Sequence, residues 1–149
     1  RSPIHSLARI LNPLAARCGL QSIFHPGYQA VHREASQLLG DHAIVVKGDG
    51  GEIELNPDAV CHLYGTERGE NWDEDWPMLS ERRHVKPERL DPTHLQAVWR
   101  GEAEDAYGQL AIIATMALAL RGLGLQREAA FAEAEKRWQA RHLSSQPIR

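Results

Sequence analysis

The sequence predicts an α/β domain in which a central, largely parallel sheet is flanked by helices. The apolar run Ala43 to Val46 is typical of a strand buried on both faces, as strands of parallel sheets are. A strand, a helix and a second strand follow one another over residues 20–46, with the spacing of a right-handed βαβ unit. Residues 106–122 are apolar nearly all round and predict a buried central helix.

The first helix is expected to begin at Ser2-Pro3, an N-cap followed by proline, and to stop at Asn12-Pro13. Its apolar face combines Ile4, Leu7, Ala8 and Leu11. Another face carries basic residues four positions apart, namely Arg1, His5 and Arg9. This basic stripe can meet a phosphate or a carboxylate, and the alternative is a solvated helix face.

The βαβ unit is expected to run from a strand at 20–24 through a turn at 25–27 and a helix at 28–39 to the strand at 43–46. Gly40 would end the helix. The residues expected to face inward are Tyr28, Val31, Ala35, Leu38 and Leu39. His25 and Lys47 then lie at the carboxyl ends of two strands, which converge if those strands are neighbours.

A glycine-rich turn, Lys47 to Gly51, follows the second strand at the place where ligands of open α/β sheets bind. Glycines let the backbone approach a ligand closely, so Lys47 and Gly48 are candidate phosphate-binding residues. Glu52 and Glu54 follow, and carboxylates can hold a phosphate through Mg²⁺. The alternative is a turn leading into a solvated acidic loop, and the P-loop pattern is absent.

The second half is expected to hold a strand at 59–64, an irregular acidic segment at 65–81 and three helices. Trp72 and Trp76 of the acidic segment either fold onto the domain or form a partner-binding flap. The next segment is basic, and it either pairs with the acidic segment or binds phosphate; its cations are Arg82, Arg83, His84, Lys86 and Arg89. Asp91-Pro92 caps a helix that ends near Trp99, and the last helix is expected at 126–141.

Composition bounds the class of protein. A chain of 149 residues is about one domain, and 42% hydrophobic with 25% charged residues is ordinary for a soluble protein. No apolar run is long enough to span a bilayer. Two cysteines, Cys18 and Cys61, are too few for a disulfide framework, and this favours a cytoplasmic setting. The eight histidines lack the ligand spacing of a zinc site. The net charge of −3 argues against a nucleic-acid binder, although the basic segments leave that function open.

Three stretches in register resemble one family. RSPIHSLARILNP, IFHPGYQAVHREASQLLG and AIVVKGDGGEIE are similar to the C-terminal half of anthranilate phosphoribosyltransferases. These are family 3 glycosyltransferases, related to the pyrimidine nucleoside phosphorylases. The resemblance implies a nucleoside phosphorylase/phosphoribosyltransferase-like catalytic domain, of which residues 1–149 would be a C-terminal portion. It also implies a homodimer formed through an N-terminal helical domain that, like the pyrophosphate loop, is not in this sequence.

The chain departs from the family at several motif positions. In the first motif Arg1, Asn12 and Pro13 are kept, whereas His5 and Arg9 stand where the family has Asn and Pro. Arg1 would inherit a place beside the aromatic acceptor. In the motif whose Asp-Glu pair binds Mg²⁺ with phosphoribosyl pyrophosphate, the matching residues are Ile53 and Glu54. Mg²⁺ binding would therefore depend on Glu54 and the nearby Glu52.

The segments RSP-x-H, KG-x-GGE-x-E-x-NPD and WRGE look most like a divergent paralogue group that binds DNA or RNA with little sequence preference. The resemblance therefore implies binding of single-stranded DNA or RNA. The candidate basic surface is Arg1, His5, Arg9 and Lys47, with Arg82, Arg83 and Lys86 as a second patch. The alternative is a working transferase that moves phosphoribosyl from its pyrophosphate to an aromatic acceptor. Arg1 would orient the acceptor, Glu54 would hold Mg²⁺, and no residue is assigned as a nucleophile. A third possibility is a structural domain without a ligand.

Overall fold

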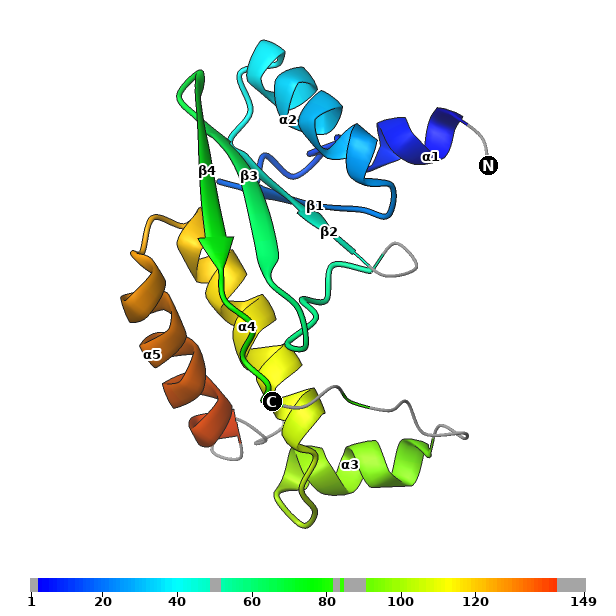
Figure 1. Ribbon diagram of the computed structural model, residues 1–149, viewed down its shortest axis with the longest axis vertical. Coiled ribbons are helices and arrows are strands. Elements are labelled where there is room, and N and C mark those ends of the chain that lie inside the picture. Colours follow the sequence, from blue (N-terminus) through cyan, green and yellow to red (C-terminus); the bar gives the residue numbers. More distant parts are fainter. Residues whose placement is uncertain (1–2, 49–51, 82–83, 85–90, 142–149) are drawn as a thin grey trace.

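The computed structural model describes residues 3–48, 52–81, 84 and 91–141 (Figure 1). The helices are α1 (Pro3–Ala8), α2 (Gln29–Leu38), α3 (Pro92–Arg100), α4 (Ala106–Gly122) and α5 (Arg127–Gln139), and a 3-10 turn (Pro26–Tyr28) precedes α2. The strands are β1 (Gly19–Ile23), β2 (Ala43–Lys47), β3 (Cys61–Glu67) and β4 (Glu70–Trp76). Within the described residues no helix is long and apolar enough to cross a membrane.

The sheet is mixed, with strand order β1-β2-β3-β4. β1 and β2 run parallel and are joined through α2, which confirms the predicted βαβ unit. β3 is antiparallel to both β2 and β4. The α/β class is therefore confirmed, but the expectation of a largely parallel sheet is wrong, because half of the sheet is a hairpin.

The hairpin of β3 and β4 occupies most of the segment that was expected to be irregular. Its tight turn places Arg68 and Gly69 at positive φ (53° and 81°), as a type I′ turn requires. In β4 the side chains of Trp72, Glu74 and Trp76 share one face, which packs inward despite the charge of the segment. Trp76 is 2% exposed, and this confirms that the indoles fold onto the domain.

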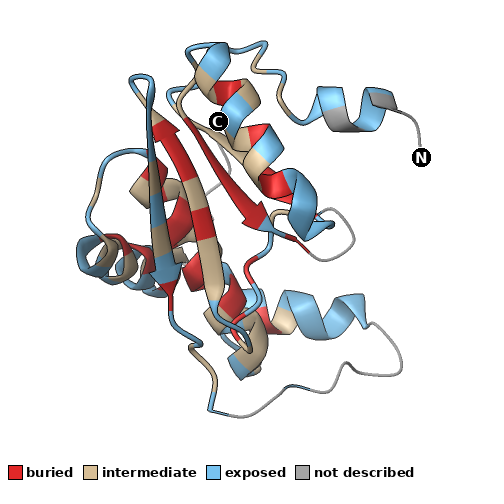
Figure 2. Ribbon diagram, turned by 45° about the horizontal axis from the view of Figure 1, so that its top comes forward, coloured by how far each residue is buried: buried red, intermediate tan, exposed pale blue. Residues whose placement is uncertain are grey.

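Helices cover both faces of the sheet. α2 lies on one face, and α4 with α5 lies on the other (Figures 1 and 2). The side chains of β2 from Ala43 to Val46 are almost fully buried, as predicted for a strand enclosed on both faces. The main core lies between the sheet and α4–α5, and it joins Ile44, Val46, Leu63, Leu118 and Trp138. The prediction that residues 106–122 form the buried central helix is confirmed.

The predicted inward face of α2 is wrong. Val31, Leu38 and Leu39 are exposed, Leu38 by 89%, as is Tyr28 just before the helix. The buried residues are instead Gln29, His32 and Ser36. The cause lies on β1, where the buried amide of Gln21 donates to Ser36 Oγ (2.8 Å) and accepts from His32 Nδ1 (2.9 Å). A buried polar group on the strand selects the polar face of the helix.

The C-terminal helices are fixed by caps and by one arginine. Asp91 caps α3 by accepting from the Thr93 amide, and Asp105 caps α4 by accepting from the Gly108 amide. Arg141 donates to the carbonyls of Val98 and Trp99 at the end of α3 and lies over the Trp138 ring at 3.7 Å. This side chain ties α3 to α5.

Candidate functional site

The carboxyl ends of β1 and β2 lie side by side. Ile23 is paired with Lys47 in the parallel register, and the Gly48 amide donates to the Ile23 carbonyl at 3.3 Å. His25 and Lys47 therefore follow neighbouring strands, as the sequence predicted, and both are exposed. The structure brings these two candidate residues to one edge of the sheet.

Gly48 sits where no side chain fits. A Cβ atom added there would overlap Ser22 Oγ and the Glu52 carbonyl oxygen. Ser22 Oγ itself donates to the Glu52 carbonyl, so the chain that leaves β2 returns directly over the end of β1. The close approach explains why glycine follows Lys47, and it fixes the position of residue 52. Residues 49–51 lie outside the described part of the chain.

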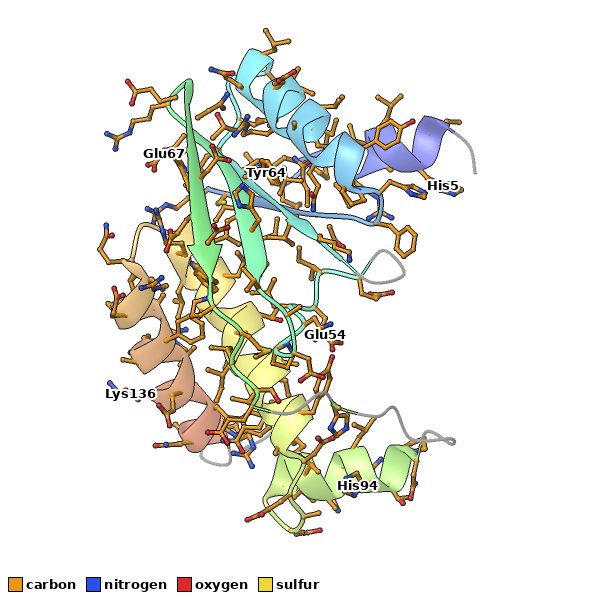
Figure 3. All side chains as sticks on the ribbon, viewed as in Figure 1. His5, Glu54, Tyr64, Glu67, His94 and Lys136 are labelled. Carbon is orange, nitrogen blue, oxygen red and sulfur yellow. The ribbon has the colours of Figure 1, made fainter. Side chains whose placement is uncertain are left out.

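Arg9 also contacts this edge of the sheet. It follows α1, and its guanidinium donates to the carbonyl oxygen of Ser22 near the end of β1. His5 is exposed on α1 (Figure 3). The structure thus places Arg9 and Lys47 at the ends of two adjacent strands, while Arg1, the third basic residue of the α1 stripe, lies outside the described residues.

A buried histidine, His32, contacts β1 at Gln21, close to this edge of the sheet. His32 on α2 donates through Nδ1 to Gln21, which leaves Nε2 as the group that takes up a proton. Burial, and secondarily the charge of Arg9, lower the pKa of His32 below its ordinary value. His32 was not singled out as a site residue from the sequence, because its neighbour Gln21 comes from a different element.

The two candidate metal ligands lie on one wall of a cleft. Glu52 and Glu54 are exposed, and both line a cleft of about 650 Å³ between β1, α3 and α4. Their segment is anchored at its far end, because the Leu55 amide donates to Thr115 Oγ1 on α4 at 3.1 Å. Ile53 packs against the core and lines the same cleft. Figure 3 shows Glu54 beside α4.

Two carboxylates suit Mg²⁺, which keeps several waters and binds through one or two carboxylates together with substrate phosphates. Within residues 3–48, 52–81, 84 and 91–141, no three His, Cys, Asp or Glu residues are grouped as a metal site would require. Glu52 and Glu54 therefore fit a Mg²⁺ ion that arrives with a phosphate ligand, and they do not by themselves make a closed metal site.

The acidic segment of β4 is paired in a way that the sequence did not reveal. Asp73 bonds to Arg33 of α2 at 2.9 Å, and Glu74 bonds to Arg121 of α4 at 2.9 Å. His62 lies between Asp75 (2.5 Å) and Asp73 (3.3 Å). These partners come from distant parts of the chain, whereas the simpler expectation was pairing with the adjacent basic cluster.

The second basic patch, Arg82, Arg83 and Lys86, lies outside the described residues, as does Arg89. His84 alone of that cluster is described. Its ring stacks on Tyr107 at 4.7 Å between centroids, and its amide donates to Asp58 Oδ2 at 2.6 Å.

The two thiols contribute no nucleophile at neutral pH. Burial raises the pKa of Cys18 and of Cys61 to about 11 each, with a further rise from Glu67 for the first and from Asp75 for the second. Both therefore stay protonated and behave as small apolar side chains, as the sequence suggested.

Comparison with known proteins adds no family assignment. No protein-family model matches the chain, and a search of curated proteins found no match.

Proposed function

We propose that this chain binds single-stranded nucleic acid through phosphate contacts at the carboxyl edge of β1 and β2, with little preference for sequence. The pairing of Ile23 with Lys47 carries the proposal, because it sets Lys47 beside the strand whose end is held by Arg9. His25 follows β1 and His5 lies on α1, and both are exposed. Cationic groups at the ends of two adjacent strands match the charge of a phosphodiester.

The pairing of the acidic strand supports this proposal. Since Asp73 and Glu74 are bonded to Arg33 and Arg121, the local negative charge of β4 is partly compensated, while the net charge of −3 is unchanged. The resemblance to the nucleic-acid-binding paralogue group supports it as well. Phosphate contacts would dominate affinity, so binding should weaken steeply with salt.

The test is a titration with fluorescent single-stranded DNA at two salt concentrations. Replacement of Arg9 and Lys47 by alanine should lower affinity about tenfold and reduce the salt slope by about 1.4, since each lost phosphate contact on a single strand removes about 0.7. The matched control replaces Lys136 and Arg137, exposed on α5, and removes the same charge (Figure 3). Equal loss in the two double variants, or binding that ignores salt, would refute the proposal.

Arg9 also supports the fold through Ser22, so Lys47→Ala is measured alone as well. The Lys47 side chain is exposed, and its removal should leave the melting temperature unchanged while affinity falls. A loss of affinity only in variants that also melt early would show that the edge is structural.

A second candidate function is transfer of a phosphoribosyl group from its pyrophosphate to an aromatic acceptor. The observation in its favour is that Glu52 and Glu54 line a cleft directly beyond the glycine turn. In this case catalysis would rest on positioning and charge stabilisation, with Glu54 holding Mg²⁺. Calorimetry with phosphoribosyl pyrophosphate and Mg²⁺ tests it, because binding must be lost in Glu52→Gln/Glu54→Gln if those carboxylates hold the metal.

A further inference from the structure

The cleft beside Glu54 has a chemical character that neither phosphate binding nor a metal explains. Its floor is one side of α4, and its walls are Leu20 of β1, the segment Glu52 to Glu54, and Leu95 of α3. The α4 residues in it are Gly108, Ala111, Ile112, Thr115, Met116 and Ala119. At about 650 Å³ it lies within the range of small-molecule sites, which are mostly apolar with a few polar groups.

Apolar side chains in this cleft remain open to solvent. Leu95 is 61% exposed and Ile112 is 37% exposed. An apolar body placed between them would remove this surface from water, which is favourable in proportion to the area covered. Three of the α4 residues in the cleft are small, namely Gly108, Ala111 and Ala119.

The charged side chains among the described lining residues of the cleft are both carboxylates. Thr115 is already used, because its hydroxyl accepts from Leu55 and donates to the Ala111 carbonyl at 2.7 Å. Among the described residues that line the cleft, the remaining charged groups are Glu52 and Glu54, and none is a cation. An anionic ligand would therefore meet repulsion, while a positive group would find partners at the mouth.

The backbone that carries the two glutamates is held at both ends. The Glu52 carbonyl is bonded to Ser22 on β1, and Leu55, 2% exposed, anchors the other end to α4 through Thr115. The segment between them carries both glutamates at i and i+2, which places them on the same side of an extended chain. The backbone of both glutamates is therefore fixed relative to the apolar floor.

From this arrangement we propose that the cleft binds a small organic cation, with an aromatic or alicyclic body on α4 and an ammonium or amidinium group between Glu52 and Glu54. This site adjoins the cationic edge, because Glu52 contacts Ser22 at the end of β1, but Arg9 and Lys47 are not among its lining residues. Because the same two carboxylates would hold Mg²⁺ in the second candidate function, an organic cation and Mg²⁺ with phosphoribosyl pyrophosphate would compete for them.

The test compares three probes that share one ring system and differ in charge. 1-Naphthylmethylammonium, 1-naphthylmethanol and 1-naphthoate are titrated against the whole chain, with backbone amide NMR shifts as the readout. The ammonium should bind about 2- to 25-fold more tightly than the alcohol, since each exposed carboxylate contributes a factor of about 1.4 to 5, and the naphthoate should bind least. Shifts should centre on residues 111–119 and on 52–55.

Substitutions inside and outside the cleft locate the effect. Glu52→Gln/Glu54→Gln should make the ammonium and the alcohol bind equally and leave the alcohol unchanged. The control Glu102→Gln/Glu104→Gln removes the same charge from exposed positions outside the cleft and should alter nothing. Ala119→Phe should fill the floor and weaken all three probes, with a thermal melt to confirm folding. If that variant is unfolded, Ile112→Gln serves in its place.

Several results would overturn the proposal. The first is failure of all three probes to bind at millimolar concentration, which is also the result expected if a polypeptide segment occupies the cleft. The others are naphthoate binding as tightly as the ammonium, and discrimination by charge that survives removal of both glutamates. None of these outcomes bears on binding of DNA at Arg9 and Lys47, so the two proposals fail separately.

Discussion

At the scale of single residues, His32 shows how a buried polar contact makes stability depend on pH. The ring is 5% exposed and is held by Gln21, and burial lowers its pKa in the folded state. The unfolded chain has a histidine pKa near 6.5, so between these two values the unfolded state binds more protons. The contribution of neutral His32 is complete above about pH 6.5 and is lost as the pH falls toward the lower, folded value.

We therefore expect the free energy of unfolding to fall between pH 7.5 and pH 5, with a smaller fall in His32→Gln. The measurement is urea unfolding at both pH values, and the relevant quantity is the difference between wild type and variant. His25→Gln, at an exposed position, is the control and should match wild type. Identical pH dependence in wild type and His32→Gln would contradict the account.

At the scale of elements, the hairpin β3–β4 depends on a glycine under an indole. Gly65 is paired with Trp72, and a Cβ atom at Gly65 would overlap the six-membered ring of that indole. Trp72 is held from above by Arg121, whose guanidinium lies 4.3 Å from the ring centroid. The indole therefore has little freedom to move aside.

Gly65→Ala should lower the free energy of unfolding by about 1–3 kcal/mol, the usual cost of overpacking. Denaturant unfolding measures it. Gly27→Ala is a matched control, because a Cβ there would meet nothing within 4 Å, and it should change stability by less than about 0.5 kcal/mol. Equal effects at the two positions would show that the indole does not define the hairpin.

The elements also show where sequence patterns inform and where they mislead. β2 and α4 were predictable, because a β-branched run and an apolar helix are buried whatever their neighbours are. The inward face of α2 was not, since the apolar stripe of Val31 and Leu38 is exposed and the polar partners of Gln21 decide the orientation. Strand β4 was missed because its charges are neutralised by Arg33 and Arg121, which lie 40 and 47 residues away.

At the scale of the whole molecule, the same distinction holds for the candidate sites. The meeting of His25 and Lys47 followed from the βαβ topology alone, because parallel neighbours end at one edge. The contact of Arg9 with Ser22 and the cleft beside Glu54 depend on how α1, α3 and α4 pack, which a pattern of spacing does not encode. Elements were predictable from local sequence, whereas surfaces formed by distant elements required the fold.

Stability is expected to be distributed unevenly over this molecule. The least stable part is expected to be α1, which directly precedes Arg9 of the proposed DNA-binding edge. The core joins β2, β3, β4, α3, α4 and α5, whereas α1 is six residues long and exposes Ile4, Leu7 and Ala8. A helix so short gains little from its own hydrogen bonds and relies on contacts such as that of Arg9. Amides of α1 should therefore exchange with solvent through local opening, and those of α4 only through global unfolding.

Hydrogen exchange followed by mass spectrometry can test this order and connect it to function. Peptides covering α1 should exchange at least about tenfold faster than those covering residues 113–120, and Arg9→Gln should widen the gap. If DNA binds at Arg9, saturating single-stranded DNA should slow exchange in α1 and leave residues 113–120 unchanged, because a ligand stabilises the state that it binds. Exchange in α1 that is as slow as in α4 would refute the hierarchy. Exchange that DNA leaves unaltered would move the binding surface away from this edge.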